Sequence, residues 1–291
     1  MSSIERYIEK MGQSAQSPKA EELPPMPAVP PSPCKASPGQ ASKQAVSIDF
    51  VKLKAAGMLT PDTSQEKLSE EYRAIKRPLL RNAFGRAKLA AGSREHANLI
   101  MVTSSLPSEG KSFTAINLAM SMAMERDYTV LLVEADVGRP AVCRYCGIDE
   151  PGLGLVDYLA DQGRELSELL LRTNVPKLSI LPAGKHHPSS TELLGSEAMH
   201  ALMAELSSRY PDRVVIFDSP PLLVSNEAVT LSSMVGQIVF VIEAVRTERS
   251  KVRQALELLD GGAVVGAVLN KFRGKSSAVY GYGYGAAKRE A

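Results

Sequence analysis

The sequence predicts an α/β fold: a doubly wound, mainly parallel sheet with helices on both faces. One observation is that short apolar runs of strand length recur along the chain, at residues 99–102, 129–133, 178–181, 213–217, 237–242 and 263–269. Another is that segments with apolar residues at helical spacing separate several of these runs. Strands that alternate with helical segments are typical of parallel sheets. A chain of 291 residues suits one medium-sized domain with appendages.

The composition excludes several classes of protein. A formal net charge of +2 argues against bulk electrostatic binding of nucleic acid. Three cysteines without a regular spacing suit a reducing compartment better than a disulfide framework. No apolar run approaches the roughly 20 residues that a membrane-spanning helix needs, and no secretory signal is present. We therefore expect a cytoplasmic protein that contacts a membrane only through a partner or a surface patch.

The distribution of residue types divides the chain into three regions. Residues 1–45 are rich in proline and are expected to be disordered, apart from a short amphipathic helix over residues 2–11. This helix either frays or docks onto a partner or a membrane surface, and the proline-rich stretch is a spacer or a ligand. Residues 46–272 are expected to fold, and residues 273–291 form a glycine-rich tail.

The stretch from Asn98 to Met124 has the pattern of a phosphate-binding loop. A short strand leads into a turn-rich loop, and Lys111 and Ser112 begin an apolar-periodic helix. Backbone N–H groups and the helix N-terminus then point into one concavity, Lys111 supplies a cation for phosphates, and Ser112 supplies a hydroxyl for Mg²⁺. Serine replaces the first glycine of the usual motif, and the alternative is a surface turn. The candidates for nucleotide contact are Ser105, Pro107, Ser108, Glu109, Gly110, Lys111, Ser112 and Phe113.

Acidic residues follow two of the apolar runs. Glu134 and Asp136 follow one run, and Asp218 follows another, just before Pro220 and Pro221. Carboxylates at the C-terminal ends of parallel strands face the ligand crevice of a doubly wound sheet. Because Glu134 and Asp136 are two residues apart, both point to one face of a regular strand; the alternative is a strand-end cap. Asp218 is expected to hold Mg²⁺ or its water.

Several local features also carry predictions. Residues 64–77 have a helical composition that Pro78 is expected to end or kink, and residues 190–210 are expected to form one helix. Cys143 and Cys146 are interpreted as buried thiols on a helix face, because a zinc site needs further ligands. One side of the helix over residues 64–77 is charged, which marks either a solvated face or an assembly face, through Glu70, Arg73 and Lys76.

Together, these motifs resemble those of the bacterial tyrosine autokinases of exopolysaccharide synthesis, a branch of the phosphate-loop ATPases related to the MinD/ParA type. TSSLPSEGKS is similar to that family's first phosphate motif, LLVEADVGRP to its second, and VVIFDSPP to its third. IDFVKLKAAGMLTPD and EEYRAIKRPLL are closest to the branch associated with exosortase A loci. The resemblance covers residues 46–285 and implies the phosphate-loop NTPase fold.

The resemblance also implies protein-tyrosine kinase activity, with ATP as phosphoryl donor and Mg²⁺ as cofactor. The catalytic residues would be Lys111, Glu134, Asp136 and Asp218; Mg²⁺ would be held by Ser112, Asp136 and Asp218, and adenine would be read by Asn270. Another copy would phosphorylate the tail on Tyr280, Tyr282 and Tyr284, although a plain low-complexity tail is the alternative. Unphosphorylated copies would form a ring through Glu70, Arg73 and Lys76. A membrane-embedded polysaccharide co-polymerase would be the activator and would hold the protein at the inner membrane.

Three residues depart from the family pattern. Glu134 replaces the usual aspartate, Gly138 takes a basic position with Arg139 next to it, and Lys76 takes the place of an arginine. These changes keep open a nucleotide-binding regulator without catalysis. A positioning ATPase of the MinD/ParA type is the other alternative, but the second lysine typical of its loop is absent and the tyrosine cluster has no role there.

Overall fold

The computed structural model describes residues 45–63, 67–85, 96–161, 163–210, 212–259 and 262–272. The expected N-terminal helix and proline-rich segment, and the tyrosine-rich tail, lie outside these residues. Every described residue belongs to the unit of the chain that begins at Gln40. Within the described ranges, no helix combines the length and apolar character needed to cross a membrane.

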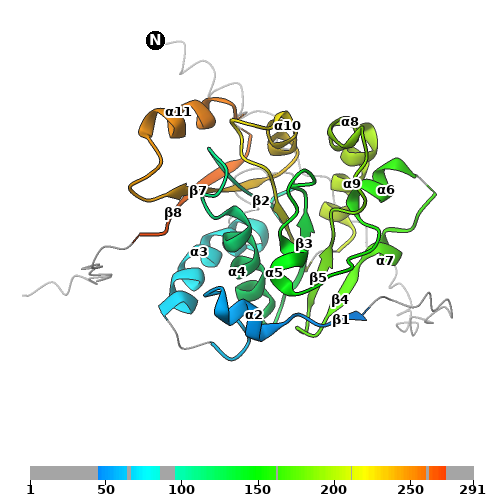
Figure 1. Cartoon of the computed structure of the whole chain (residues 1–291), viewed down its shortest axis with the longest axis horizontal. Coiled ribbons are helices and arrows are strands. Elements are labelled where there is room, and N and C mark those ends of the chain that lie inside the picture. The colour runs from blue at the N-terminus through cyan, green and yellow to red at the C-terminus, as the bar shows by residue number, and fades with distance from the viewer. Residues whose placement is uncertain are drawn as a thin grey trace, which may run out of the picture. The chain divides into compact units, whose positions relative to one another are not determined.

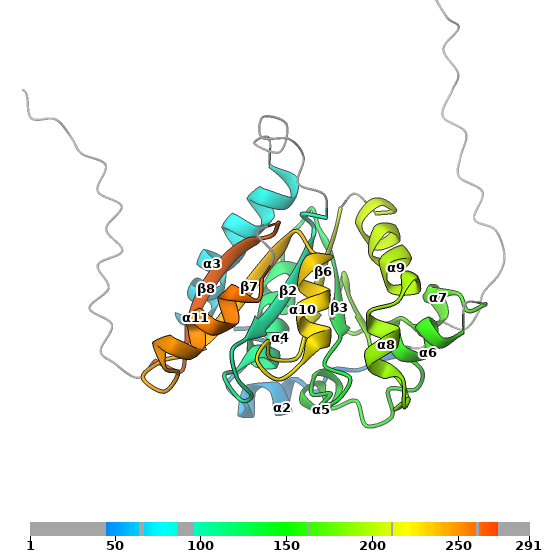
Figure 2. The same cartoon turned by 90° about the horizontal axis from the view of Figure 1, so that it is seen from above.

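Among the described residues, eight strands form one sheet in the order β1-β4-β5-β3-β6-β2-β7-β8. Neighbouring strands are parallel, apart from the antiparallel pair β4 and β5. In Figure 2 the strands can be followed across the molecule from β8 to β3. The strands are β1 (Ala45–Val46), β2 (Leu99–Ser104), β3 (Thr129–Glu134), β4 (Leu171–Thr173), β5 (Leu178–Leu181), β6 (Arg213–Asp218), β7 (Gln237–Glu243) and β8 (Val264–Asn270).

Helices cover both faces of this sheet (Figure 1). One apolar cluster joins the sheet to α2 (Phe50–Ala55), α3 (Lys67–Phe84), α4 (Lys111–Ala123) and α5 (Val142–Cys146). The other joins it to α6 (Leu155–Ala160), α7 (Leu166–Leu169), α8 (Ser190–Leu194), α9 (Glu197–Ser208), α10 (Asn226–Ser233) and α11 (Arg249–Glu257). The predicted doubly wound α/β fold is confirmed.

The central strands are continuous apolar runs because both of their faces are buried. In β2, Ile100 and Val102 pack in the α4 cluster, whereas Leu99 and Met101 pack in the opposite cluster. Successive side chains of a strand point to opposite faces, so a strand covered on both sides must be apolar at every position.

The predicted helix over residues 64–77 is longer than expected. Helix α3 continues through Pro78 to Phe84, so of the two outcomes expected at this proline, an end or a kink, the end of the helix is not found. Pro78 lacks the N–H that would bond to the carbonyl of Ala74, but both residues are exposed, and water can satisfy that carbonyl. Tyr72 and Leu79 on the buried side of α3 pack into the core and hold the helix together.

The predicted helix over residues 190–210 is two helices. It breaks at Gly195 and Ser196, and α9 begins after Ser196, whose hydroxyl accepts a hydrogen bond from the backbone N–H of Met199 at 3.4 Å. A serine with extended backbone is a preferred helix N-cap, so this signal was present in the sequence.

The interpretation of Cys143 and Cys146 is confirmed. Both lie on α5, and only 5% and 1% of their surfaces are exposed. Burial raises the pKa of both thiols, which keeps them protonated and unreactive at neutral pH.

The charged side of α3 is only partly as predicted. Glu70 and Arg73 are exposed, but Lys76 is 6% exposed. The Lys76 ammonium donates to the Ser121 carbonyl at 2.6 Å and pairs with Glu125 at 2.8 Å. The expected place of Lys76 on an exposed assembly face is therefore wrong, because this side chain ties α3 to α4 within one chain.

Candidate active site

The predicted phosphate-binding loop lies between the end of β2 at Ser104 and the start of α4 at Lys111. Gly110 precedes α4 with a φ of 103°, in the left-handed region that favours glycine. A Cβ at this position would lie 1.9 Å from the side-chain nitrogen of Asn270. Backbone conformation and lack of space both require glycine here.

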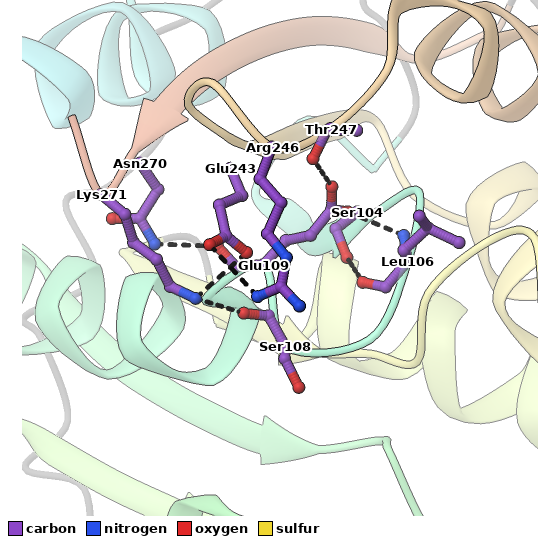
Figure 3. A network of polar contacts seen from close by, with 9 residues as sticks. All are labelled: Ser104, Leu106, Ser108, Glu109, Glu243, Arg246, Thr247, Asn270 and Lys271. Atoms are coloured by element: carbon purple, nitrogen blue, oxygen red, sulfur yellow. Dashed lines mark hydrogen bonds and ion pairs between the residues drawn. The ribbon is translucent and has the colours of Figure 1, made fainter.

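The loop is held from inside by a buried carboxylate. Only 2% of Glu109 is exposed, and its side chain accepts hydrogen bonds from the backbone N–H of Leu106 at 2.7 Å and from the hydroxyl of Thr247 (Figure 3). Glu109 therefore connects Leu106, within the loop, to Thr247, in the segment after β7. It was predicted to contact nucleotide, but it is a brace that does not line the cavity described below.

The end of β8 holds the loop from outside. Asn270 donates its side-chain N–H to the carbonyl of Glu109 at 2.9 Å, and the Lys271 ammonium donates to the carbonyl of Ser108 at 2.6 Å. Lys271 in turn pairs with Glu243 at 3.2 Å, as Figure 3 shows. The loop is thus fixed before any ligand binds, which favours a preorganised phosphate site.

A cavity of about 990 Å³ opens beside the loop. This volume is at the upper end of the range typical of ligand pockets. The phosphate loop and α4 contribute Pro107, Ser108, Gly110, Lys111, Ser112 and Phe113. The segment from β3 to α5 contributes Asp136, Gly138, Arg139, Arg144 and Tyr145, and the end of β8 contributes Asn270 and Lys271. Ser105 was predicted to contact nucleotide, but it is completely buried and does not line this cavity.

Asp218 is an uncompensated buried carboxylate at the end of β6. It is 0% exposed, and neither carboxylate oxygen accepts a hydrogen bond of good geometry. Burial raises its pKa to about 7, although the Ser112 hydroxyl and the Lys111 ammonium oppose this shift. Such a group is costly unless a cation reaches it.

Asp136 lies beside Asp218. Its backbone N–H donates to the Asp218 carbonyl at 2.9 Å, and its side chain lines the cavity. Burial raises the pKa of Asp136, whereas the nearby Lys111 lowers it. With the Ser112 hydroxyl, these two carboxylates fit the oxygen ligands that Mg²⁺ prefers.

This donor set is incomplete by itself. Among the described residues, no three histidine, cysteine or acidic side chains converge closely enough to hold a metal. Mg²⁺ usually keeps waters and binds through one or two carboxylates plus substrate phosphates. The residues present therefore fit a site that the nucleotide completes.

Glu134 does not share the cavity with Asp136. Its carboxylate is 1% exposed and accepts hydrogen bonds from the backbone N–H groups of Val142 at 2.6 Å and Ala183 at 3.3 Å. The prediction that Glu134 and Asp136 point to one face is wrong, because β3 ends at Glu134 and strand alternation stops there. The strand-end cap is the arrangement found.

No family model matches the chain, but individual proteins do. Tyrosine-protein kinase CpsD of Streptococcus agalactiae is 30% identical over 230 residues, which are 78% of this chain and 94% of CpsD. Tyrosine-protein kinase YwqD of Bacillus subtilis is 32% identical over 216 residues, which are 74% of this chain and 85% of YwqD. The chain belongs to the bacterial tyrosine-protein kinases.

Solved structures agree with this assignment. The kinase domain of VpsO is 28% identical, with a TM-score of 0.55 over 71% of this chain and all of that domain. The kinase domain of Escherichia coli ETK is 24% identical, with a TM-score of 0.63 over 77% of this chain and 83% of that domain. MinD of Pyrococcus horikoshii with Mg-ADP has a TM-score of 0.50 at 20% identity, over 59% of this chain and 69% of MinD. The last two likenesses show the phosphate-loop fold alone.

The sequence motifs did not reveal the residues that brace the loop. Thr247 and Lys271 lie 138 and 163 residues from their loop partners along the chain. No local pattern marks them, since they act only once β7 has paired with β2 and β8 with β7. The nearest signal was the position of Asn270 and Lys271 at the end of the last predicted strand.

Proposed function

We propose that this kinase transfers the γ-phosphoryl group of ATP to Tyr280, Tyr282 and Tyr284 in the tail of another copy. The bond between the γ-phosphorus and the β–γ bridging oxygen breaks, a bond forms between that phosphorus and the phenolic oxygen, and the products are ADP and phosphotyrosine. The observation that carries this proposal is the braced phosphate loop beside a cavity lined by Asp136, whose backbone N–H bonds to the buried Asp218.

Each residue of the site has a distinct role in this proposal. The loop's backbone N–H groups and Lys111 bind the β- and γ-phosphates of ATP. Ser112, Asp136 and Asp218 would hold Mg²⁺, which neutralises negative charge on the phosphates when bound. Asn270 keeps the loop in position and lines the cavity, and we assign it the contact with the base of the nucleotide.

Asp136 is the proposed base for the tyrosine hydroxyl. An unperturbed phenol has a pKa near 10, so a carboxylate that accepts the proton lowers the barrier at neutral pH. Asp136 lines the cavity, whereas Glu134 is engaged by two backbone N–H groups away from it. This leaves Asp136 as the available member of the pair.

The wider role proposed here follows the resemblance of the motifs. We assign the kinase to the control of exopolysaccharide synthesis, at the inner membrane, with a membrane-embedded co-polymerase as activator. Ring assembly of unphosphorylated copies would use the exposed part of α3 at Glu70 and Arg73, without Lys76. Exposed ion pairs contribute only about 0–1 kcal/mol each, so such a ring would be salt-sensitive.

The test is to incubate the full chain with labelled ATP and Mg²⁺ and to map phosphotyrosine by mass spectrometry. We expect phosphate on Tyr280, Tyr282 and Tyr284, and its loss in Lys111→Met. Lys251→Met is a matched control, because Lys251 is exposed on α11, outside the cavity. Equal labelling of Lys111→Met and wild type, with unchanged melting temperatures, would contradict the assignment.

A further inference from the structure

The cavity carries two positive charges that the nucleotide site does not account for. Four of its lining residues are cationic, and two of them already have partners: Lys111 lies near Asp136 and Asp218, and Lys271 pairs with Glu243. The remaining two are Arg139 and Arg144. Arg139 lies near enough to Asp136 to lower the pKa of that carboxyl, but among the described residues neither guanidinium makes an ion pair or a hydrogen bond with a side chain.

The two arginines lie on a backbone that the fold holds in place. The backbone N–H of Arg139 donates to the carbonyl of Asp136 at 3.1 Å. Glu134 fixes the start of α5 through Val142, and the carbonyl of Cys146 at its end accepts the backbone N–H of Asp49 at 2.9 Å. Exposed cationic side chains on a fixed backbone are suited to bind an anionic ligand reversibly.

An aromatic surface accompanies the charges. Tyr145 is half-buried and lines the same cavity, and the Arg144 guanidinium lies 5.7 Å from the centre of its ring. Guanidinium groups bind phosphate with paired hydrogen bonds, and an aromatic ring offers a face to another ring. Together these groups suit an aryl phosphate better than a free carboxylate.

We propose that Arg139, Arg144 and Tyr145 form a subsite for phosphotyrosine of the tail. This inference rests on the proposed function, which supplies that group as its product. Tyrosines at every second position lie on the same side of an extended chain, so a phosphate on Tyr284 can bind the arginines while Tyr282 faces Asp136. The first phosphate thereby promotes transfer of the next phosphate to the same tail. Doubly and triply phosphorylated tails therefore accumulate ahead of singly phosphorylated ones.

Binding of tail peptides tests the subsite without relying on catalysis. The peptide of residues 278–287, AVYGYGYGAA, is prepared unmodified and with phosphate on Tyr284. Both are titrated by fluorescence anisotropy against the full chain in which all three tail tyrosines are phenylalanine, with Mg²⁺ and ADP present. We expect the phosphopeptide to bind about tenfold more tightly, with a difference that shrinks at high salt.

The double variant Arg139→Gln, Arg144→Gln should bring this ratio close to one. Both side chains are exposed, so the variant should fold, and its melting temperature verifies this. Arg253→Gln is the matched control, because Arg253 is an exposed arginine of α11 that does not line the cavity, and it should keep the tenfold ratio.

Two results would overturn the subsite: equal binding of both peptides by the otherwise wild-type chain, or a ratio that persists in the double variant. A weaker affinity for ADP in the double variant, with no change in the peptide ratio, would assign the arginines to the nucleotide instead. Failure of the proposed function would look different. The unmodified peptide would gain no phosphate from ATP, whatever the ratio of binding affinities.

Discussion

The ends of two neighbouring strands, β3 and β6, carry acids with opposite surroundings. Glu134 and Asp218 are register partners across the sheet, and both are almost completely buried. Two backbone N–H groups bind the Glu134 carboxylate, whereas the Asp218 carboxylate accepts no hydrogen bond of good geometry, although the Ser112 hydroxyl and the Lys111 ammonium lie near it. A buried charge that the fold leaves unpaired is a functional candidate, and one that the fold satisfies is a structural element.

The largest effect is expected from removal of the unpaired charge. Asp218→Asn keeps the shape of the side chain but cannot become an anionic ligand for Mg²⁺. In phosphoryl transfer, which depends on positioning and charge, we expect a loss of roughly 10³-fold in autophosphorylation. Quantitative phosphotyrosine blotting at saturating ATP measures this. Activity within tenfold of wild type would remove Asp218 from the metal site.

A smaller loss of activity is expected when Asp136, which lines the cavity, is replaced. Asp136→Asn removes the proposed base, and general-base catalysis contributes about 10²–10⁴-fold. We expect roughly a 10²-fold fall in the rate of phosphate transfer to the unmodified tail peptide, measured at saturating ATP and Mg²⁺. If Asp136→Asn transfers phosphate as fast as wild type, another group accepts the proton.

Replacement of Glu134, whose carboxylate is hydrogen-bonded by the fold, should affect stability more than catalysis. Glu134→Gln leaves one acceptor oxygen for two backbone N–H donors, and hydrogen bonds to charged groups contribute about 1.5–3 kcal/mol. We expect the free energy of unfolding to fall by about 2 kcal/mol in chemical denaturation. Phosphate transfer by the folded variant should fall by less than about tenfold, because the side chain does not line the cavity. A 10²-fold or larger loss with unchanged stability would return Glu134 to the catalytic group.

The same strand ends show what sequence alone could predict. The apolar runs and the Gly-Lys-Ser loop were sufficient for the fold, the order of elements and the place of Lys111 and Ser112, because these depend on local pattern. The role of Glu134 could not be predicted in this way, because the spacing of residues shows which face they share only as far as the strand continues. Its partners, Val142 and Ala183, meet it only after β3 and β5 have paired.

Burial was the other limit of the sequence analysis. The i, i+3, i+6 spacing of Glu70, Arg73 and Lys76 correctly indicated one side of a helix. It carried no information about where α4 would lie, and Lys76 is buried by that contact. The same limit applies to the phosphate loop. Its position follows from the local sequence pattern, but the hydrogen bonds that it receives from Asn270 and Thr247 depend on how the strands of the sheet pair.

The fold buries the Asp218 carboxylate without a hydrogen bond of good geometry, and the pH dependence of stability tests this most directly. A carboxyl group with a raised pKa in the folded state contributes stability below its unfolded pKa of about 3.8, and that contribution is lost as the pH rises through about 7. Asparagine stays neutral throughout. Without Mg²⁺ or nucleotide, the free energy of unfolding of Asp218→Asn should exceed that of wild type by an amount that grows from pH 4 to pH 8, up to about 4 kcal/mol. A variant that is equally or less stable than wild type at pH 8 would contradict the claim.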